Sequence, residues 1–224
     1  MATVGVEWVQ KYNGLQGNLS NTKAQAEGFY NTLAATRQFN WGDDLAWDQD
    51  FETQGRGSPT AGTDQIYADN VDAVFFSGHG SPDRFYFGVQ VDDSVTKNTE
   101  VLWGNWDAEI IALDACNILE ESGVFNRWGW PVFAGLHYIL GFHTVTGDEP
   151  HRGRLLAQYL NAGWTVREAW IRAAQDTEGS STQWAYLRAD APGTNTYSSH
   201  WWGKGSVSPD PINPNILFYA RGAC

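Results

Sequence analysis

Two short runs of apolar residues constrain the fold of this chain more than any other feature. Residues 71–76 read Val-Asp-Ala-Val-Phe-Phe, residues 109–113 read Glu-Ile-Ile-Ala-Leu, and polar residues follow each run directly. Apolar runs of this length, rich in strand formers, are typical of parallel strands covered on both faces, whereas a strand with one wet face alternates. The two runs therefore predict an α/β fold with a mostly parallel central sheet flanked by helices.

The rest of the chain supplies further strands and helices of the same kind. Alternating residues predict a strand at the N-terminus, and apolar residues at i, i+3, i+4 spacing predict amphipathic helices, two of which begin with a capping-box sequence. The predicted strands, in addition to the two runs, are residues 3–9, 131–135 and 215–220. The predicted helices are residues 22–37, 151–161 and 165–178, with Val166, Ala169, Trp170, Ala173 and Ala174 as the buried stripe of the last one.

We expect one domain over residues 1–224, because no clean linker interrupts the chain and a chain of 224 residues can bury a sizeable core. Residues 39–64 are acidic and glycine-bearing without sustained periodicity, which indicates a long loop or insertion of the kind that often has a function. A second irregular segment is expected near residues 180–214, which are rich in Pro, Gly, Ser and Asn.

Charge and hydropathy exclude two classes of partner. The formal net charge is −12, and a protein that neutralises phosphates needs clustered Lys and Arg, so we expect no nucleic acid. No stretch of 18 apolar residues is present and the N-terminus lacks the features of a signal peptide, so we expect no membrane span. The protein would be cytoplasmic as written, or secreted if a signal peptide was removed. The oligomeric state is left open.

The polar residues that follow the two apolar runs carry the chemistry. His79 comes three residues after the first run and Cys116 three residues after the second, and function in a parallel sheet gathers beyond the carboxyl ends of the strands. If the two strands are neighbours, the side chains can meet, and an imidazole can make a thiolate available near neutral pH. Taken singly, such a cysteine is usually a small core residue, and a His-Gly pair often marks only a turn.

Gly80 follows the histidine directly, and the backbone amides of Gly80 and Cys116 are the candidate donors to the oxyanion of a tetrahedral intermediate. No metal or cofactor is expected, because the remaining histidines form no ligand motif and the acidic residues 43–50 lack the spacing of an EF-hand loop. Cys224 is the second cysteine, and sequence leaves open whether it forms a bridge with Cys116.

Together these segments resemble the caspase–hemoglobinase fold of cysteine peptidases, which includes caspases, legumains, gingipains, separases and clostripain-like enzymes. The resemblance lies in Ser77-Gly78-His79-Gly80 and in Leu113-Asp114-Ala115-Cys116, each at the end of a strand, and it extends over residues 71–177. It implies a caspase-like three-layer sandwich and a catalytic dyad of Cys116 and His79. Asn117 departs from the glycine-containing turn that follows the cysteine in several members.

The resemblance also implies a substrate pocket. In clostripain-like members an acidic residue two positions before the nucleophile helps to bind a basic side chain, and Asp114 has that position; it can equally cap a helix that starts near Asn117. Asp148 is a candidate second carboxylate, and we add Ser77 as a substrate-binding residue.

The expected function is cysteine-dependent acyl transfer by a peptidase, with cleavage of the peptide after a basic residue. Two alternatives remain. One is a cysteine-dependent enzyme that acts on a small molecule without proteolysis. The other is a catalytically inactive caspase-like binding module, in which tryptophan-rich loops bind the ligand; the sequence contains 12 tryptophans, several of them beside glycines.

Overall fold

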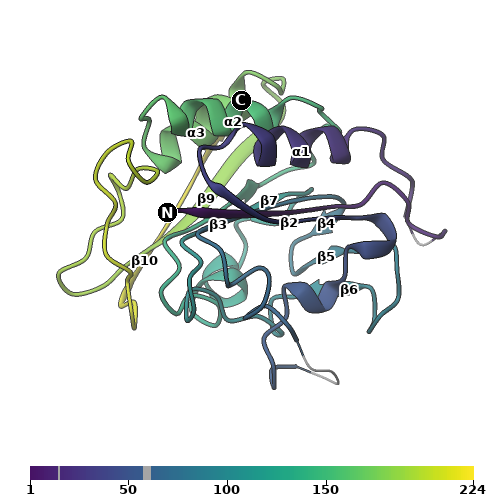
Figure 1. Cartoon of the computed structure of the whole chain (residues 1–224), viewed down its shortest axis with the longest axis horizontal. Coiled ribbons are helices and arrows are strands. Elements are labelled where there is room, and N and C mark those ends of the chain that lie inside the picture. The colour runs from purple at the N-terminus through teal and green to yellow at the C-terminus, as the bar shows by residue number, and fades with distance from the viewer. Residues whose placement is uncertain (15, 58–61) are drawn as a thin grey trace.

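A computed structural model describes residues 1–14, 16–57 and 62–224, and in this part of the chain one seven-stranded sheet has the order β10-β9-β8-β7-β3-β1-β2 (Figure 1). The five strands β8, β7, β3, β1 and β2 are parallel to one another. At the β8 edge, β9 pairs antiparallel to β8, and β10 pairs antiparallel to β9. The sheet consists of β1 (Thr3–Trp8), β2 (Thr36–Gly42), β3 (Ala73–Ser77), β7 (Ile110–Asp114), β8 (Tyr138–Phe142), β9 (Gln183–Asp190) and β10 (Ile216–Ala223).

The two apolar runs are the centre of this sheet. Every residue of β3 and of β7 is buried, and the two strands pair in parallel with Ser77 opposite Asp114. Both faces of each strand are covered, which is why neither run alternates. The strand predicted from residues 3–9 is also present, as β1, and it pairs with β3.

The described α-helices cover one face of the sheet, as Figure 1 shows. They are α1 (Thr22–Thr32), α2 (Arg152–Asn161) and α3 (Val166–Gln175). The capping box of α3 is confirmed, because the Thr165 side chain accepts from the backbone N–H of Glu168. The predicted stripe of α3 is buried, and the Trp170 indole donates to the carbonyls of Gly141 and Ala185, so that it fixes the helix over β8 and β9.

The opposite face is covered by irregular segments and a small antiparallel sheet, in which the described strands are β4 (Gly80–Ser81), β5 (Arg84–Tyr86) and β6 (Val95–Lys97). Short helical turns at residues 43–45, 48–50 and 125–129 belong to the same layer. Its core is aromatic: Phe51, Phe85, Trp103 and Trp128 are fully buried there. The predicted α/β class with a mostly parallel sheet between two layers is therefore confirmed, with the α-helices gathered on one face.

One strand prediction was wrong in position. Residues 131–135 form no strand, and only Phe133 makes a single bridge, to Trp103. Pro131 lacks an N–H for a ladder and Gly135 has φ +149°, so this apolar run packs into the irregular layer instead. The third parallel strand is β8, residues 138–142.

The helix predicted over 22–37 ends at Thr32, and its predicted capping box is absent because the Thr22 hydroxyl donates to the carbonyl of Val9 instead. Residues 36–42 form β2, which pairs with the free edge of β1 and so satisfies backbone groups that a longer helix would bond internally. The loop expected over 39–64 therefore begins after residue 42, and residues 58–61 of that loop lie outside the described residues.

The irregular segment expected over 180–214 was wrong at its start, since residues 183–190 form β9, a strand inside the sheet. Its charged residues hid it, because Arg188 and Asp190 pair with each other at 2.5 Å rather than face water. The last strand, predicted at 215–220, is confirmed as β10.

No helix in the described part of the chain is long and apolar enough to cross a bilayer.

Candidate active site

The two candidate catalytic residues lie at equivalent places on neighbouring strands. Ser77 and Asp114 are paired across β3 and β7, and His79 and Cys116 each come two residues later. Because both strands run in the same direction, both residues leave the sheet at its carboxyl edge. The condition set by the sequence, that the two strands be neighbours, is therefore met.

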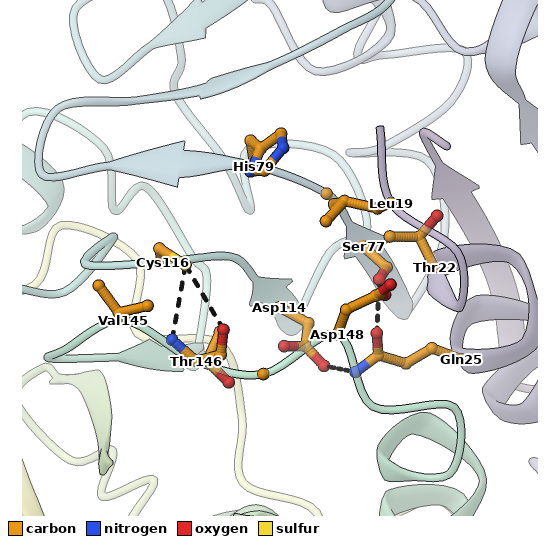
Figure 2. A pocket seen from close by; sticks show the side chains of 12 residues that line it. Leu19, Thr22, Gln25, Ser77, His79, Asp114, Cys116, Val145, Thr146 and Asp148 are labelled. Atoms are coloured by element: carbon orange, nitrogen blue, oxygen red, sulfur yellow. Dashed lines mark hydrogen bonds between the residues drawn. The ribbon is translucent and has the colours of Figure 1, made fainter. Parts of the chain in front are cut away.

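Both residues line one pocket at this edge, with a volume of about 220 Å³ (Figure 2). Four segments contribute: the beginning of α1, the ends of β3 and β7, and residues 145–148. The lining residues are Leu19, Thr22, Gln25, Ser77, Gly78, His79, Asp114, Cys116, Val145, Thr146, Gly147 and Asp148. All the candidate site residues of the sequence except Gly80 belong to this set.

Cys116 is half-buried and its sulfur contacts the backbone of Thr146. The Thr146 N–H donates to Sγ at 3.5 Å, and the thiol donates to the Thr146 carbonyl at 3.7 Å (Figure 2). Burial raises the pKa of the Cys116 thiol above its ordinary value, and the carboxylates of Asp114 and Glu178 raise it further. In this arrangement the sulfur is a protonated thiol.

His79 is held from two sides. Its backbone N–H donates to the Tyr12 hydroxyl at 2.8 Å, its ring lies 4.7 Å from the Tyr12 ring between centroids, and its Nε2 bonds to the Gly17 carbonyl at 2.7 Å. A carbonyl only accepts, so Nε2 carries a proton, and in the neutral tautomer with this contact the lone pair is on Nδ1. Among the described residues no hydrogen bond joins His79 to Cys116, and the lone pair is not used.

The two candidate oxyanion donors differ in position. In the part of the chain that the structure describes, the Cys116 amide donates no hydrogen bond, so it is free to face a ligand. Gly80 begins β4, opposite Phe85, and does not line the pocket. A Cβ at Gly80 would lie 2.7 Å from the Cβ of Ala115 and 3.0 Å from the Cys116 carbonyl oxygen. Glycine is therefore needed there for the loops after β3 and β7 to pack together.

Asp114 lines the pocket, but its charge is directed into the protein. Arg152, which is fully buried, donates to it at 2.5 Å, and the Gln25 amide donates to its other oxygen. Burial raises the pKa of Asp114 to about 6, although Arg152 opposes that change. The alternative role as a helix cap is wrong, because residues 116–119 form a turn and not a helix.

The candidates Ser77 and Asp148 bind other parts of the protein. The Ser77 hydroxyl donates to the Gln25 side-chain carbonyl at 2.6 Å, so that Gln25 bridges Ser77 and Asp114 beneath the pocket (Figure 2). The Asp148 carboxylate accepts from the backbone N–H groups of Ser20 at 2.6 Å and Asn21 at 3.1 Å, just before α1. Asp148 thereby closes one wall of the pocket.

Sequence reasoning missed the residues that support this site, namely Tyr12, Gln25, Arg152 and Glu178. Glu178 accepts from Arg152, from the Thr146 hydroxyl at 2.8 Å and from the Gly147 N–H at 2.8 Å. One chain of polar contacts therefore runs from β3 through Gln25, Asp114 and Arg152 to the segment that contacts the thiol. No local motif marks these residues, since each is far in sequence from its partners.

The described residues contain one group of carboxylates spaced to hold a metal ion: Asp48, Glu52 and Asp93 each place an oxygen within 4.8 Å of the others. None of the three lines the pocket. The two cysteines are both free, so the bridge that sequence left open between Cys116 and Cys224 is absent.

The fold and the pocket define an α/β protein with a thiol and an imidazole at the carboxyl edge of its sheet. The chain belongs to the family described as "Domain of unknown function (DUF6345)", whose model matches residues 6–222. No curated protein matches it.

Among solved structures the chain is similar to a secreted C11 cysteine protease from Bacteroides thetaiotaomicron, determined by X-ray crystallography in complex with an irreversible peptide inhibitor. The identity is 10%, the match covers 84% of this chain and 66% of that chain, and the TM-score is 0.41. The chain thus spans about two thirds of the length of that structure. At this level of likeness no residue role is transferred from one protein to the other.

Proposed function

We propose that this protein is a cysteine-dependent acyl-transfer enzyme, a peptidase in which Cys116 is the nucleophile and His79 transfers the protons. The observation that carries the proposal is the equal offset of the two residues beyond the paired ends of β3 and β7, with both side chains lining one pocket. A thiol and an imidazole so placed are what covalent catalysis on a carbonyl requires.

The reaction follows from the tautomer of His79. Nδ1 takes the thiol proton, the sulfur attacks the carbonyl carbon, and the free Cys116 amide donates to the oxygen that becomes negative. The imidazolium returns the proton to the leaving amine as the carbon–nitrogen bond breaks. Water then hydrolyses the thioester with Nδ1 again as the base. Throughout, the Gly17 carbonyl holds Nε2–H and fixes the ring.

The structure represents a resting state in this proposal, because the thiol is bonded to Thr146 and its pKa is raised. A substrate that enters the pocket replaces the contact between Thr146 and the sulfur, so that His79 Nδ1 can take the thiol proton. Binding of substrate and activation of the nucleophile are therefore coupled.

For specificity we propose a basic side chain in the substrate. Asp148 supports this proposal because its partly exposed carboxylate lines the pocket and pairs with backbone amides rather than with a cation. Asp114 contributes less, since Arg152 already neutralises it. Asp148→Asn is expected to lower kcat/KM for arginyl substrates and to leave leucyl substrates little changed.

The test uses peptidyl chloromethyl ketones with Arg or Leu next to the reactive group, followed by mass mapping of the labelled cysteine. We expect covalent labelling of Cys116 and not of Cys224, with Cys224→Ala as the matched control. His79→Ala is expected to slow labelling by about 10²–10⁴-fold, the usual contribution of a general base, whereas His143→Ala, outside the pocket, is expected to have little effect.

Two outcomes would favour the alternatives. A Cys116 that reacts with small alkylating agents while peptide amides are inert would point to a small-molecule substrate. Equal labelling of Cys116 and Cys224, with no dependence on His79, would contradict the proposal and leave a binding module of the same fold.

A further inference from the structure

Glu7 is an acidic residue buried in the sheet, in the strand next to its β2 edge. It lies in β1, its exposure is 0%, and among the described residues neither of its carboxyl oxygens has a hydrogen-bond partner. Leaving a carboxyl group in the interior without partners is costly. Burial raises the pKa of Glu7 well above its usual range, and the nearby carboxyl of Asp50 adds to this effect.

Asp50 is also almost fully buried, and its carboxylate accepts a hydrogen bond from the Thr63 hydroxyl at 3.0 Å. Burial raises its pKa to about 6, and the charged residues that act on Glu7 and Asp50 are acids, including Asp48. None of the ion pairs in residues 1–14, 16–57 and 62–224 includes Glu7 or Asp50. Two adjacent carboxyl groups therefore lie in the core without a positive charge beside them.

A second pocket reaches Asp50. Its volume is about 110 Å³, and it is lined by Trp41, Leu45, Trp47, Asp50 and Tyr67. Glu7 pairs with Trp41 across β1 and β2, and paired residues of parallel strands point to the same face, so Glu7 lies beside the Trp41 wall. The Trp41 and Tyr67 rings meet edge to face at 6.5 Å. Trp47 and Leu45 are 39% and 57% exposed, so the pocket is open to solvent.

We propose that this second pocket binds the methylated ammonium group of a ligand, with Trp41, Trp47 and Tyr67 as the walls and Asp50 as the counter-ion. Aromatic faces attract cations, and quaternary ammonium groups suit such walls because their charge is spread over methyl groups that need no hydrogen bonds. Asp50 is the charged residue in the lining, and it supplies the attraction that an apolar ligand would not use. A bound cation also provides a countercharge for Asp50, which has no ion-pair partner among the described residues.

The chemistry of the pocket favours a methylated ammonium over other cations. A guanidinium carries five N–H donors in one plane and needs several acceptors, and an unmodified ammonium carries three. The lining offers one carboxylate and otherwise aromatic or aliphatic side chains. The indole N–H of Trp47 is already donated to the Asp44 carbonyl, which leaves the ring itself for contact.

The position of the pocket also relates it to the candidate active site. Trp41 lies near the carboxyl end of β2, and β2 is two strands from β3, which leads to His79. Two strand spacings amount to about 10 Å. A peptide in the candidate active site can span such a distance, so the methylated ammonium group can belong to a methylated lysine in a peptide as well as to a free small molecule. The experiment separates these two sources.

The test compares choline with 3,3-dimethyl-1-butanol, in which carbon replaces the charged nitrogen, by isothermal titration of the whole protein. We expect saturable binding of choline, and binding of the neutral compound weaker by about tenfold or more, as the loss of a desolvated cation–π contact implies. Trp47→Ala and Asp50→Asn are each expected to weaken choline binding by a similar factor. Trp130→Ala is the control, because Trp130 is 51% exposed and does not line this pocket.

A second series uses peptides with trimethyllysine or unmodified lysine, and tighter binding of the trimethylated peptide than of choline would identify a peptide as the source. Cys116→Ala is expected to bind choline normally, so that failure of the peptidase proposal does not affect this one. Equal binding of choline and its neutral analogue, no saturable binding of either, or unchanged affinity in Trp47→Ala would each overturn the proposal.

Discussion

Replacing Arg152 with methionine removes the guanidinium that connects Asp114 to Glu178 beneath the candidate active site. Arg152 is fully buried, and it donates to Asp114 at 2.5 Å, to Glu178, and through Nε to the Thr177 hydroxyl at 3.0 Å. Its guanidinium also lies 4.6 Å from the centre of the Phe142 ring. Methionine retains much of the apolar stem and removes every one of these polar contacts.

The magnitude follows from what the substitution leaves behind. The side chains of Asp114 and Glu178 are only 2% and 8% exposed, and removing one partner of a buried ion pair costs about 3–5 kcal/mol because the remaining charge is uncompensated. For a domain of this size each kcal/mol corresponds to about 2–4 °C, so a loss of about 4 kcal/mol lowers Tm by about 8–16 °C. Protonation of Asp114 reduces the loss, so the destabilisation is expected to be smaller at pH 5 than at pH 8.

The assay is urea unfolding followed by tryptophan fluorescence, with Arg172→Met as the matched control. Arg172 also pairs with a carboxylate, Asp176, but on the surface of α3, where such pairs contribute little. A fall in stability for Arg152→Met no larger than that for Arg172→Met would refute the view that Arg152 holds the site together. The double variant Arg152→Met/Asp114→Asn is expected to recover part of the loss.

Two further predictions concern other buried groups. Burial raises the pKa of Glu109 from 4.5 to about 10, so the folded state retains a proton that the unfolded state has lost, and stability falls as pH rises from 4.5 towards 10. Glu109→Gln should therefore raise the free energy of unfolding at pH 8 and change it little at pH 4. An equal change at both pH values would contradict the reasoning. Gly80→Ala places a Cβ against Ala115 and Cys116 and should cost about 1–3 kcal/mol in urea unfolding. Gly179→Ala, which meets nothing within 4 Å, is the control, and equal stability of the two variants would show that the loops adjust freely.

The central part of the fold could be predicted from sequence because burial on both faces leaves a continuous apolar run. This condition holds for β3 and β7, and the capping box of α3 could be read for a similarly local reason. It fails for β9, where Arg188 and Asp190 satisfy each other inside the protein. It also fails for residues 131–135, whose apolar side chains pack in the irregular layer and not in the sheet.

The candidate site likewise contains residues that local sequence reveals and residues whose roles depend on partners far away in the chain. His79 and Cys116 could be found because each directly follows a recognisable strand. The roles of Asp114 and Gln25 depend on Arg152, which comes 38 residues after Asp114 and from the start of another helix. Sequence spacing gives no measure of such a distance, so the free carboxylate expected at Asp114 is in fact the partner of a buried arginine.

The contact between Cys116 and Thr146 also bears on how the protein tolerates oxidants. Peroxides attack the thiolate and react slowly with the protonated thiol, and the sulfur of Cys116 is half-buried with a raised pKa. A half-buried, protonated sulfur is therefore shielded from conversion to sulfenic and sulfinic acids. Burial, which is the main cause of the raised pKa of Cys116, therefore outweighs the Thr146 N–H, which acts in the opposite direction.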